Sequence, residues 1–123
     1  MQMSNAIYAA FDSVTPATLL PEVYDELRER LEFTGAIVSA DLTATTATAG
    51  GNVGDAAVEA LKAGADMLLV PGGRAQQDEA FREVVAAVRR REIPAERVVT
   101  ALRRIATLRR LSRGARQAVK VPG

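Results

Sequence analysis

Residues 56–70 read Ala56-Ala57-Val58-Glu59-Ala60-Leu61-Lys62-Ala63-Gly64-Ala65-Asp66-Met67-Leu68-Leu69-Val70. The apolar positions before Gly64 recur at helical spacing, and they predict a helix over residues 53–63. Gly64 suits the left-handed position that follows the last turn of a helix. Residues 67–70 form a continuous apolar run, which is typical of a strand buried on both faces. This stretch therefore predicts a helix that leads directly into a buried strand.

The sequence on either side repeats this alternation. Short apolar runs predict strands within residues 1–8 and 36–39, while helical periodicity predicts a helix that Pro21 opens and further helices near 76–91 and 95–111. Residues 43–52 are small and polar, so we expect a mobile loop there. Alternating strands and helices are the signature of βαβ units. The predicted fold class is α/β: about three βα units with parallel strands, plus an extra C-terminal helix.

Three strands are few for a parallel sheet. Such a sheet leaves two long edges unpaired, and its faces normally need cover on both sides. The pattern thus predicts a part of something larger. One hypothesis that follows is an interaction module, which forms a homo-oligomer or pairs with a complementary fragment.

The composition excludes several classes of chemistry. The 123 residues contain no cysteine, histidine or tryptophan. Disulfides, thiol nucleophiles and cysteine-based zinc sites are therefore absent, and so is the commonest general base. Asp41, Asp55 and Asp66 are not clustered at ligand spacing, so we expect no metal, and we expect no cofactor. Without a signal sequence or a run of 18 apolar residues, the expectation is a cytoplasmic protein with no membrane partner.

Two glycine-rich segments precede predicted helices. Residues 50–54 and 71–74 both resemble phosphate-binding loops in that respect. The first lacks the lysine and hydroxyl residue of a P-loop. We expect a flexible loop at the first position and a plain turn at the second.

The net charge of +1 conceals an asymmetry. Residues 1–81 carry 12 acidic and 4 basic side chains, whereas residues 82–123 carry 3 acidic and 12 basic ones. The arginine clusters of the second part suggest nucleic-acid binding as an alternative function. No aromatic residue lies among them to stack on bases, and they fall largely off the apolar face of the last helix. The sequence therefore disfavours nucleic acid and favours basic helices that cover an acidic portion.

Three stretches taken in order carry a family resemblance. They are Met3–Tyr8 with Thr15–Leu19, Leu31–Leu42, and Ala56–Val70. They resemble the sixth strand, the nucleophile signature, and the seventh helix with the eighth strand of glycoside hydrolase family 3, especially its β-N-acetylhexosaminidase-like branch. The resemblance implies that residues 1–111 are the C-terminal part of the family's catalytic (β/α)8 barrel. Residues 112–123 are then expected to form a flexible basic tail.

The resemblance implies a retaining glycoside hydrolase that acts on β-linked sugars, without indicating which sugar. In that family an aspartate at the end of the seventh strand attacks the anomeric carbon. The family pattern Ser-Asp-Asp-Leu reads Ser39-Ala40-Asp41-Leu42 here, so Ala40 takes the nucleophile position and cannot form a glycosyl ester. Asp41 is the remaining substitute, but neighbouring strand side chains point to opposite faces. We expect Asp41 to cap or orient the following loop.

A second catalytic group is also missing. The acid/base of this branch is a histidine upstream of the matched segment, and the chain contains none. The first residue of the chain falls within the segment that resembles the sixth strand of the barrel. We therefore expect a truncated barrel that is inactive as this chain, and whether it works as an enzyme stays open.

Overall fold

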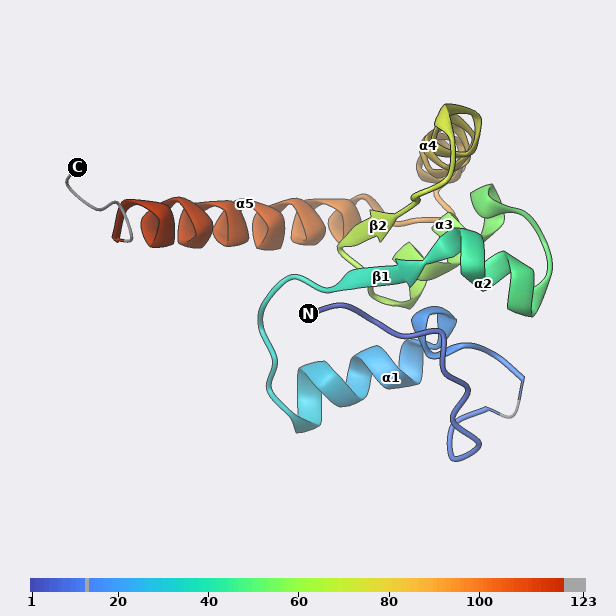
Figure 1. Cartoon of the computed structure of the whole chain (residues 1–123), viewed down its shortest axis with the longest axis horizontal. Coiled ribbons are helices and arrows are strands. Elements are labelled where there is room, and N and C mark those ends of the chain that lie inside the picture. The colour runs from blue at the N-terminus through green and yellow to red at the C-terminus, as the bar shows by residue number, and fades with distance from the viewer. Residues whose placement is uncertain (13, 119–123) are drawn as a thin grey trace.

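The computed structural model describes residues 1–12 and 14–118 and shows an α/β structure with a small parallel sheet and mostly helices (Figure 1). In chain order the elements are η1 (Ala17–Leu19), α1 (Pro21–Asp25), η2 (Glu26–Arg30), β1 (Val38–Asp41), α2 (Leu42–Ala49), α3 (Val53–Ala63), β2 (Met67–Leu69), α4 (Arg74–Arg89) and α5 (Ala95–Ala118). The helices expected at Pro21, over 53–63 and near 76–91 are confirmed.

The sheet consists of β1 and β2, which pair in parallel with Val38 opposite Met67 and Asp41 opposite Leu69. The register is irregular between these two pairs. Ser39 lies in the irregular part, where its buried Oγ accepts a hydrogen bond from the Leu69 N–H at 2.9 Å. A side-chain hydroxyl thus takes the place of a backbone acceptor in the ladder.

The strand expected within residues 1–8 is wrong for most of its length. Only Gln2 forms a bridge, to Val38. Beyond Met3 the backbone turns to other partners, since the carbonyls of Ser4 and Ala6 accept from the N–H groups of Thr18 and Ala17. Pairing with η1 thus replaces pairing with β1, and the described sheet has two strands where three were expected.

Two helix predictions also need correction. The expected loop over 43–52 is largely the helix α2, because the carboxylate of Asp41 caps its first turn. The last helix, expected to end near residue 111, continues to Ala118 as α5. Its exposed distal part reaches well beyond the sheet (Figure 1). Residues 119–123 of the predicted tail lie outside the described residues.

The core is built around α3, whose small side chains let other elements approach closely. Ala57 and Ala60 are fully buried, and they pack in one cluster with Tyr24 of α1 and Ile37 before β1. Gly64 ends α3 with a φ of 139°, and a Cβ there would lie 2.8 Å from the side chain of Tyr24. The close contact between α1 and the end of α3 therefore needs glycine at this position.

The sheet itself is less covered than its sequence predicts. All four residues of the apolar run 67–70 are only half-buried. Phe81 on α4, beside β2, is 70% exposed. The expectation of a strand buried on both faces is therefore not met within the described chain. No helix among the described residues is both long and apolar enough to cross a membrane.

Candidate functional site

The C-terminal end of β1 holds the predicted site residues. Ala40 is 3% exposed, and its N–H donates to Thr18 Oγ1 at 3.0 Å. Thr18 comes from η1, so this hydrogen bond fixes the end of β1 against the N-terminal segment. The side chain of Ala40 is a methyl group, which offers no nucleophile, acid or base.

Asp41 has a structural task in this arrangement. Its Oδ1 accepts from the N–H groups of Thr43 at 2.9 Å and Ala44 at 3.1 Å, which are two of the unpaired donors at the start of α2. The expectation that Asp41 caps or orients the following segment agrees with this geometry, although that segment is a helix.

The backbone of Asp41 belongs to a small polar network. Its carbonyl oxygen accepts from Asn5 Nδ2 at 3.2 Å and lies 3.0 Å from Thr45 Oγ1, which is also 2.6 Å from Asn5 Oδ1. Asn5 follows the single bridge of the N-terminal segment, so the network joins that segment to β1 and α2. Thr43 Oγ1 is the one buried side-chain polar atom in the described chain that lacks a hydrogen-bond partner.

Side chains of this chain contact both glycine-rich segments. Asn52 caps α3 by accepting from the Asp55 N–H at 2.9 Å, and Glu79 Oε1 lies 3.4 Å from the Gly54 N–H. An acidic side chain already lies at this helix N-terminus and would repel an anion. After β2, Gln77 Nε2 donates to the carbonyls of Val70 and Gly72, which closes a plain turn.

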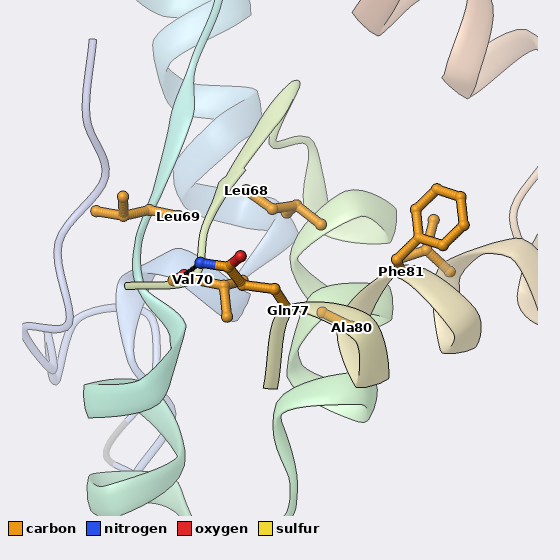
Figure 2. A pocket seen from close by; sticks show the side chains of 7 residues that line it. Leu68, Leu69, Val70, Gln77, Ala80 and Phe81 are labelled. Carbon is orange, nitrogen blue, oxygen red and sulfur yellow. Dashed lines mark hydrogen bonds between the residues drawn. The ribbon is translucent and has the colours of Figure 1, made fainter. Parts of the chain in front are cut away.

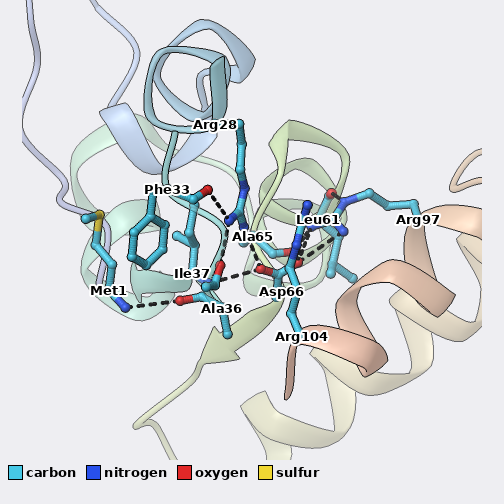
Figure 3. A network of polar contacts seen from close by, with 11 residues as sticks. Met1, Arg28, Phe33, Ala36, Ile37, Leu61, Ala65, Asp66, Arg97 and Arg104 are labelled. Carbon is cyan, nitrogen blue, oxygen red and sulfur yellow. Dashed lines mark hydrogen bonds and ion pairs between the residues drawn. The ribbon is translucent and has the colours of Figure 1, made fainter. Parts of the chain in front are cut away.

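The buried ion cluster at Asp66 was not predicted from the sequence. The side chain of Asp66, directly before β2, is fully buried, and three arginines from η2 and α5 contact it (Figure 3). Arg28 Nη2 lies 2.8 Å from Oδ2, while Arg97 and Arg104 lie 3.2 and 3.1 Å from Oδ1. Oδ2 also accepts from the Ile37 N–H at 3.0 Å. One carboxylate thus ties η2 and the first part of α5 to the sheet.

The arginines in this cluster have further partners. Arg28 Nη1 donates to the carbonyls of Phe33 and Gly35, and its guanidinium lies 5.6 Å from the Phe33 ring centre. Arg97 donates to the carbonyls of Leu61 and Ala65. Burial is the main cause that lowers the pKa of Arg28, and the neighbouring charge of Arg104 adds to it. Arg97 and Arg104 therefore do not belong to the solvated face expected for the last helix.

An apolar pocket of about 460 Å³ lies beside β2 (Figure 2). Its lining comes from the half-buried run Leu68–Val70 and from the α4 side chains of Gln77, Ala80, Phe81 and Val84. Among the described residues, no carboxylate, histidine or cysteine lines this pocket. Among the described residues no group of acidic, histidine or cysteine side chains is arranged to hold a metal ion.

A family model described as the glycosyl hydrolase family 3 N terminal domain matches residues 1–108. The chain belongs to glycosyl hydrolase family 3. The match includes β1 with Ala40 and Asp41, the Asp66 cluster and most of α5 up to residue 108.

Two curated relatives of the chain are glycosidases by name. An uncharacterized secreted glycosyl hydrolase from Arthroderma benhamiae is 40% identical over 87 residues, which are 69% of this chain and 25% of that protein. A beta-hexosaminidase from Idiomarina loihiensis is 51% identical over 49 residues, 40% of this chain and 15% of that protein. The chain thus spans a quarter or less of these curated relatives. Because the fungal relative is described as secreted, the cytoplasmic location stays a prediction.

A solved family 3 structure supports the fold. The β-N-acetylglucosaminidase from Paenibacillus sp. str. FPU-7 superimposes with a TM-score of 0.72 at 34% identity, covering 78% of this chain and 18% of that one. Most of the fold of this family 3 chain therefore also occurs within that larger protein.

Proposed function

We propose that these residues form the closing part of a family 3 catalytic barrel and do not hydrolyse glycosides as this chain alone. The observation that carries the proposal is Ala40 at the C-terminal end of β1, where the family pattern has its nucleophile. Next to it, the carboxylate of Asp41 accepts two backbone hydrogen bonds at the start of α2. Double displacement needs a nucleophile and an acid/base group on either side of the scissile bond.

The ligand class we propose is a β-linked N-acetylhexosaminide, because two of the relatives are named for such substrates. The catalytic face of a barrel lies at the C-terminal ends of its strands. Here that face carries Ala40, Asp41, Thr43 and Asn5. Under this proposal they line one side of a sugar site, and the other βα units of the barrel supply the remainder, whichever polypeptide carries them.

The test is an activity assay of the chain with 4-nitrophenyl β-N-acetylglucosaminide and the matching β-glucoside. We expect no release of nitrophenol above the rate in buffer. Asp41→Ala tests the substitute nucleophile, and Asp78→Ala on the exposed face of α4 is the matched carboxylate control. Release that disappears in Asp41→Ala and persists in Asp78→Ala would contradict the proposed inactivity.

A second candidate function is pairing with further barrel units, and the poor cover of β2 favours it. The apolar run 67–70 is half-buried, and Phe81 lies exposed at the rim of the apolar pocket beside it. Burying this surface against another strand–helix unit would remove apolar area from water and pair the open strand edge.

Sedimentation of the chain tests this second candidate. We expect concentration-dependent self-association of the chain alone, or capture of a complementary barrel fragment supplied in trans. Phe81→Ser is expected to weaken either association while the far-ultraviolet circular dichroism stays unchanged. A monomer that unfolds cooperatively and ignores the complementary fragment would rule the candidate out.

A further inference from the structure

We propose that the outer face of α5 binds the phosphate backbone of a nucleic-acid duplex, independently of sequence and of the family 3 site. The binding surface is an arginine stripe, defined as Arg103, Arg109, Arg110, Arg113 and Arg116. All five side chains are exposed, and none of them forms an ion pair within the described residues.

The structure separates this stripe from the other arginines of the helix. Arg97 and Arg104 lie on the side of α5 that faces Asp66, and that carboxylate contacts both of them. At 3.6 residues per turn the five stripe residues fall within an arc of about 140° on the other side, along about 20 Å of helix. The charge left outside the ion cluster is therefore concentrated on one side of the helix, with Arg103 at its edge, beside the crevice between α5 and residues 34–36.

Nothing on the helix itself offsets this charge. Glu96 is the last acidic residue of the chain, so no carboxylate follows it along α5. Arginine stays charged at any accessible pH, and its guanidinium matches the geometry of phosphate oxygens. Over about 20 Å a duplex presents about 12 phosphates, which is ample for five contacts.

The same geometry disfavours a membrane as the partner. A helix that lies in a bilayer surface must turn its apolar side towards the lipid. On the distal part of α5 that side carries Leu108 and Leu111, which are 44% and 67% exposed and line a crevice against residues 34–36 of the body together with Arg103. These leucines lie towards the body, whereas Arg109, Arg110, Arg113 and Arg116 lie on the other side of the helix, which suits a polyanion better than an acyl chain.

The experiment measures binding of the 123-residue chain to a fluorescent DNA duplex of about 20 base pairs over a range of salt concentrations. Five phosphate contacts give a slope of about −4.5 in log K against log salt, which is a fall of about 500-fold in affinity between about 50 and 200 mM. The triple variant R109Q/R113Q/R116Q leaves two contacts, so its slope is expected near −2, with a fall of only about 10-fold.

A matched variant separates the stripe from net charge. R74Q/R82Q/R89Q removes three exposed arginines from α4 and changes the charge equally. We expect it to keep the slope of the parent chain. Glutamine preserves helix propensity, and circular dichroism checks that α5 remains folded in both variants.

Three outcomes would overturn the proposal. The first is no salt-dependent binding of the duplex. The second is an equal loss in the α4 and α5 variants, which would assign binding to net charge. The third is binding to vesicles of phosphatidylserine with phosphatidylcholine but not to the duplex, which would assign the stripe to a lipid surface. Glycosidase activity or inactivity has no bearing on any of them, so this proposal and the proposed function fail separately.

Discussion

At the scale of single residues, Asp66 and Tyr24 carry the most demanding environments. Asp66 is a fully buried carboxylate that three guanidiniums contact. Tyr24 is 1% exposed and donates its hydroxyl to the Thr18 carbonyl at 2.8 Å. Tyr24 holds α1 and Asp66 holds η2 against the rest of the molecule, so changes at either one are expected to lower stability.

Asp66→Asn should lower the free energy of unfolding by about 3 kcal/mol, because it leaves three partly buried cations without their counter-charge. Urea denaturation measures the loss, and Asp78→Asn on the exposed surface is the control with an expected change near zero. Among the arginines, Arg97→Ala should cost more than Arg104→Ala, since Arg97 also donates to two backbone carbonyls. The reverse order would contradict the assigned contacts.

The buried hydroxyl of Tyr24 should make the folded chain less stable in alkaline solution. Burial raises the pKa of Tyr24 to about 12 from its ordinary value of 10.0. Between pH 10 and 12 the unfolded chain therefore releases a proton that the folded chain keeps, and stability falls as the pH rises. The contribution of this residue is present below pH 10, and about 2 kcal/mol of it is lost by pH 12.

Denaturation of Tyr24→Phe at pH 9 to about 12 measures this contribution. Phenylalanine has no proton to lose, so the variant should start less stable and show a flatter decline. Tyr8→Phe, at a residue that is 48% exposed, is the matched control and should follow the parent chain. Equal slopes for Tyr24→Phe and the parent would show that the prediction is wrong.

At the scale of elements, the predictions succeed where a pattern acts locally. Helix α3 and the strand after it follow from apolar spacing and from Gly64. Helix α2 was missed because its Thr/Ala composition lacks an apolar period, and its start depends on where the Asp41 carboxylate lies. The N-terminal strand failed for a tertiary reason, since η1 takes the carbonyls of Ser4 and Ala6.

In the candidate site, too, the features that a local pattern determines could be predicted and the long-range contacts could not. The substitution at Ala40 and the capping task of Asp41 could be predicted from a motif and from strand alternation. The contacts of Asn5 with Asp41 and Thr45 join residues 36 and 40 positions apart, which no local pattern encodes. The Asp66 cluster is equally long-range, and its only sequence signal was the excess of arginine after residue 82.

Asp41→Ala should destabilise the chain by about 1 kcal/mol, because α2 loses the acceptor for two N–H groups. Asp41→Asn keeps an acceptor at the cap and should cost only a few tenths of a kcal/mol. Thermal unfolding followed by circular dichroism measures both. Similar losses for the two variants would indicate that the negative charge, and not the cap, is what matters.

Replacing glycine by alanine should lower the stability at Gly64 and raise it at Gly114. Gly64→Ala is expected to cost about 2 kcal/mol or more, because the left-handed backbone disfavours a side chain and its Cβ would meet Tyr24. Gly114 lies within α5 with no neighbour within 4 Å of an added Cβ. Gly114→Ala should therefore stabilise α5 locally by up to about 1 kcal/mol, which would appear as a stronger helical circular dichroism signal. A loss of stability in Gly114→Ala would contradict the open space that the structure shows around this residue.

At the scale of the whole molecule, protection against unfolding is expected to be uneven. Helix α3 is buried among neighbours on most sides, whereas residues 106–116 of α5 are all exposed. Local opening has the lowest cost where few apolar contacts form.

Hydrogen exchange measures this gradient along the chain. Amides of residues 57–63 should exchange only through global unfolding, and those of residues 109–116 should exchange many times faster. Addition of a duplex should slow the second group if the arginine stripe binds it. Uniform protection along α5 in the free chain would contradict the expected gradient.

The long sequence separation between Asp66 and its partners bears on the order in which the elements fold. Its partners lie 29 to 38 residues away in both directions along the chain. Helix α5 therefore has no charged anchor until β2 has met β1 and Asp66 has entered the interior. We expect the two strands to join first and α5 to dock last, so that during synthesis the arginine-rich end stays undocked until the acidic part has folded.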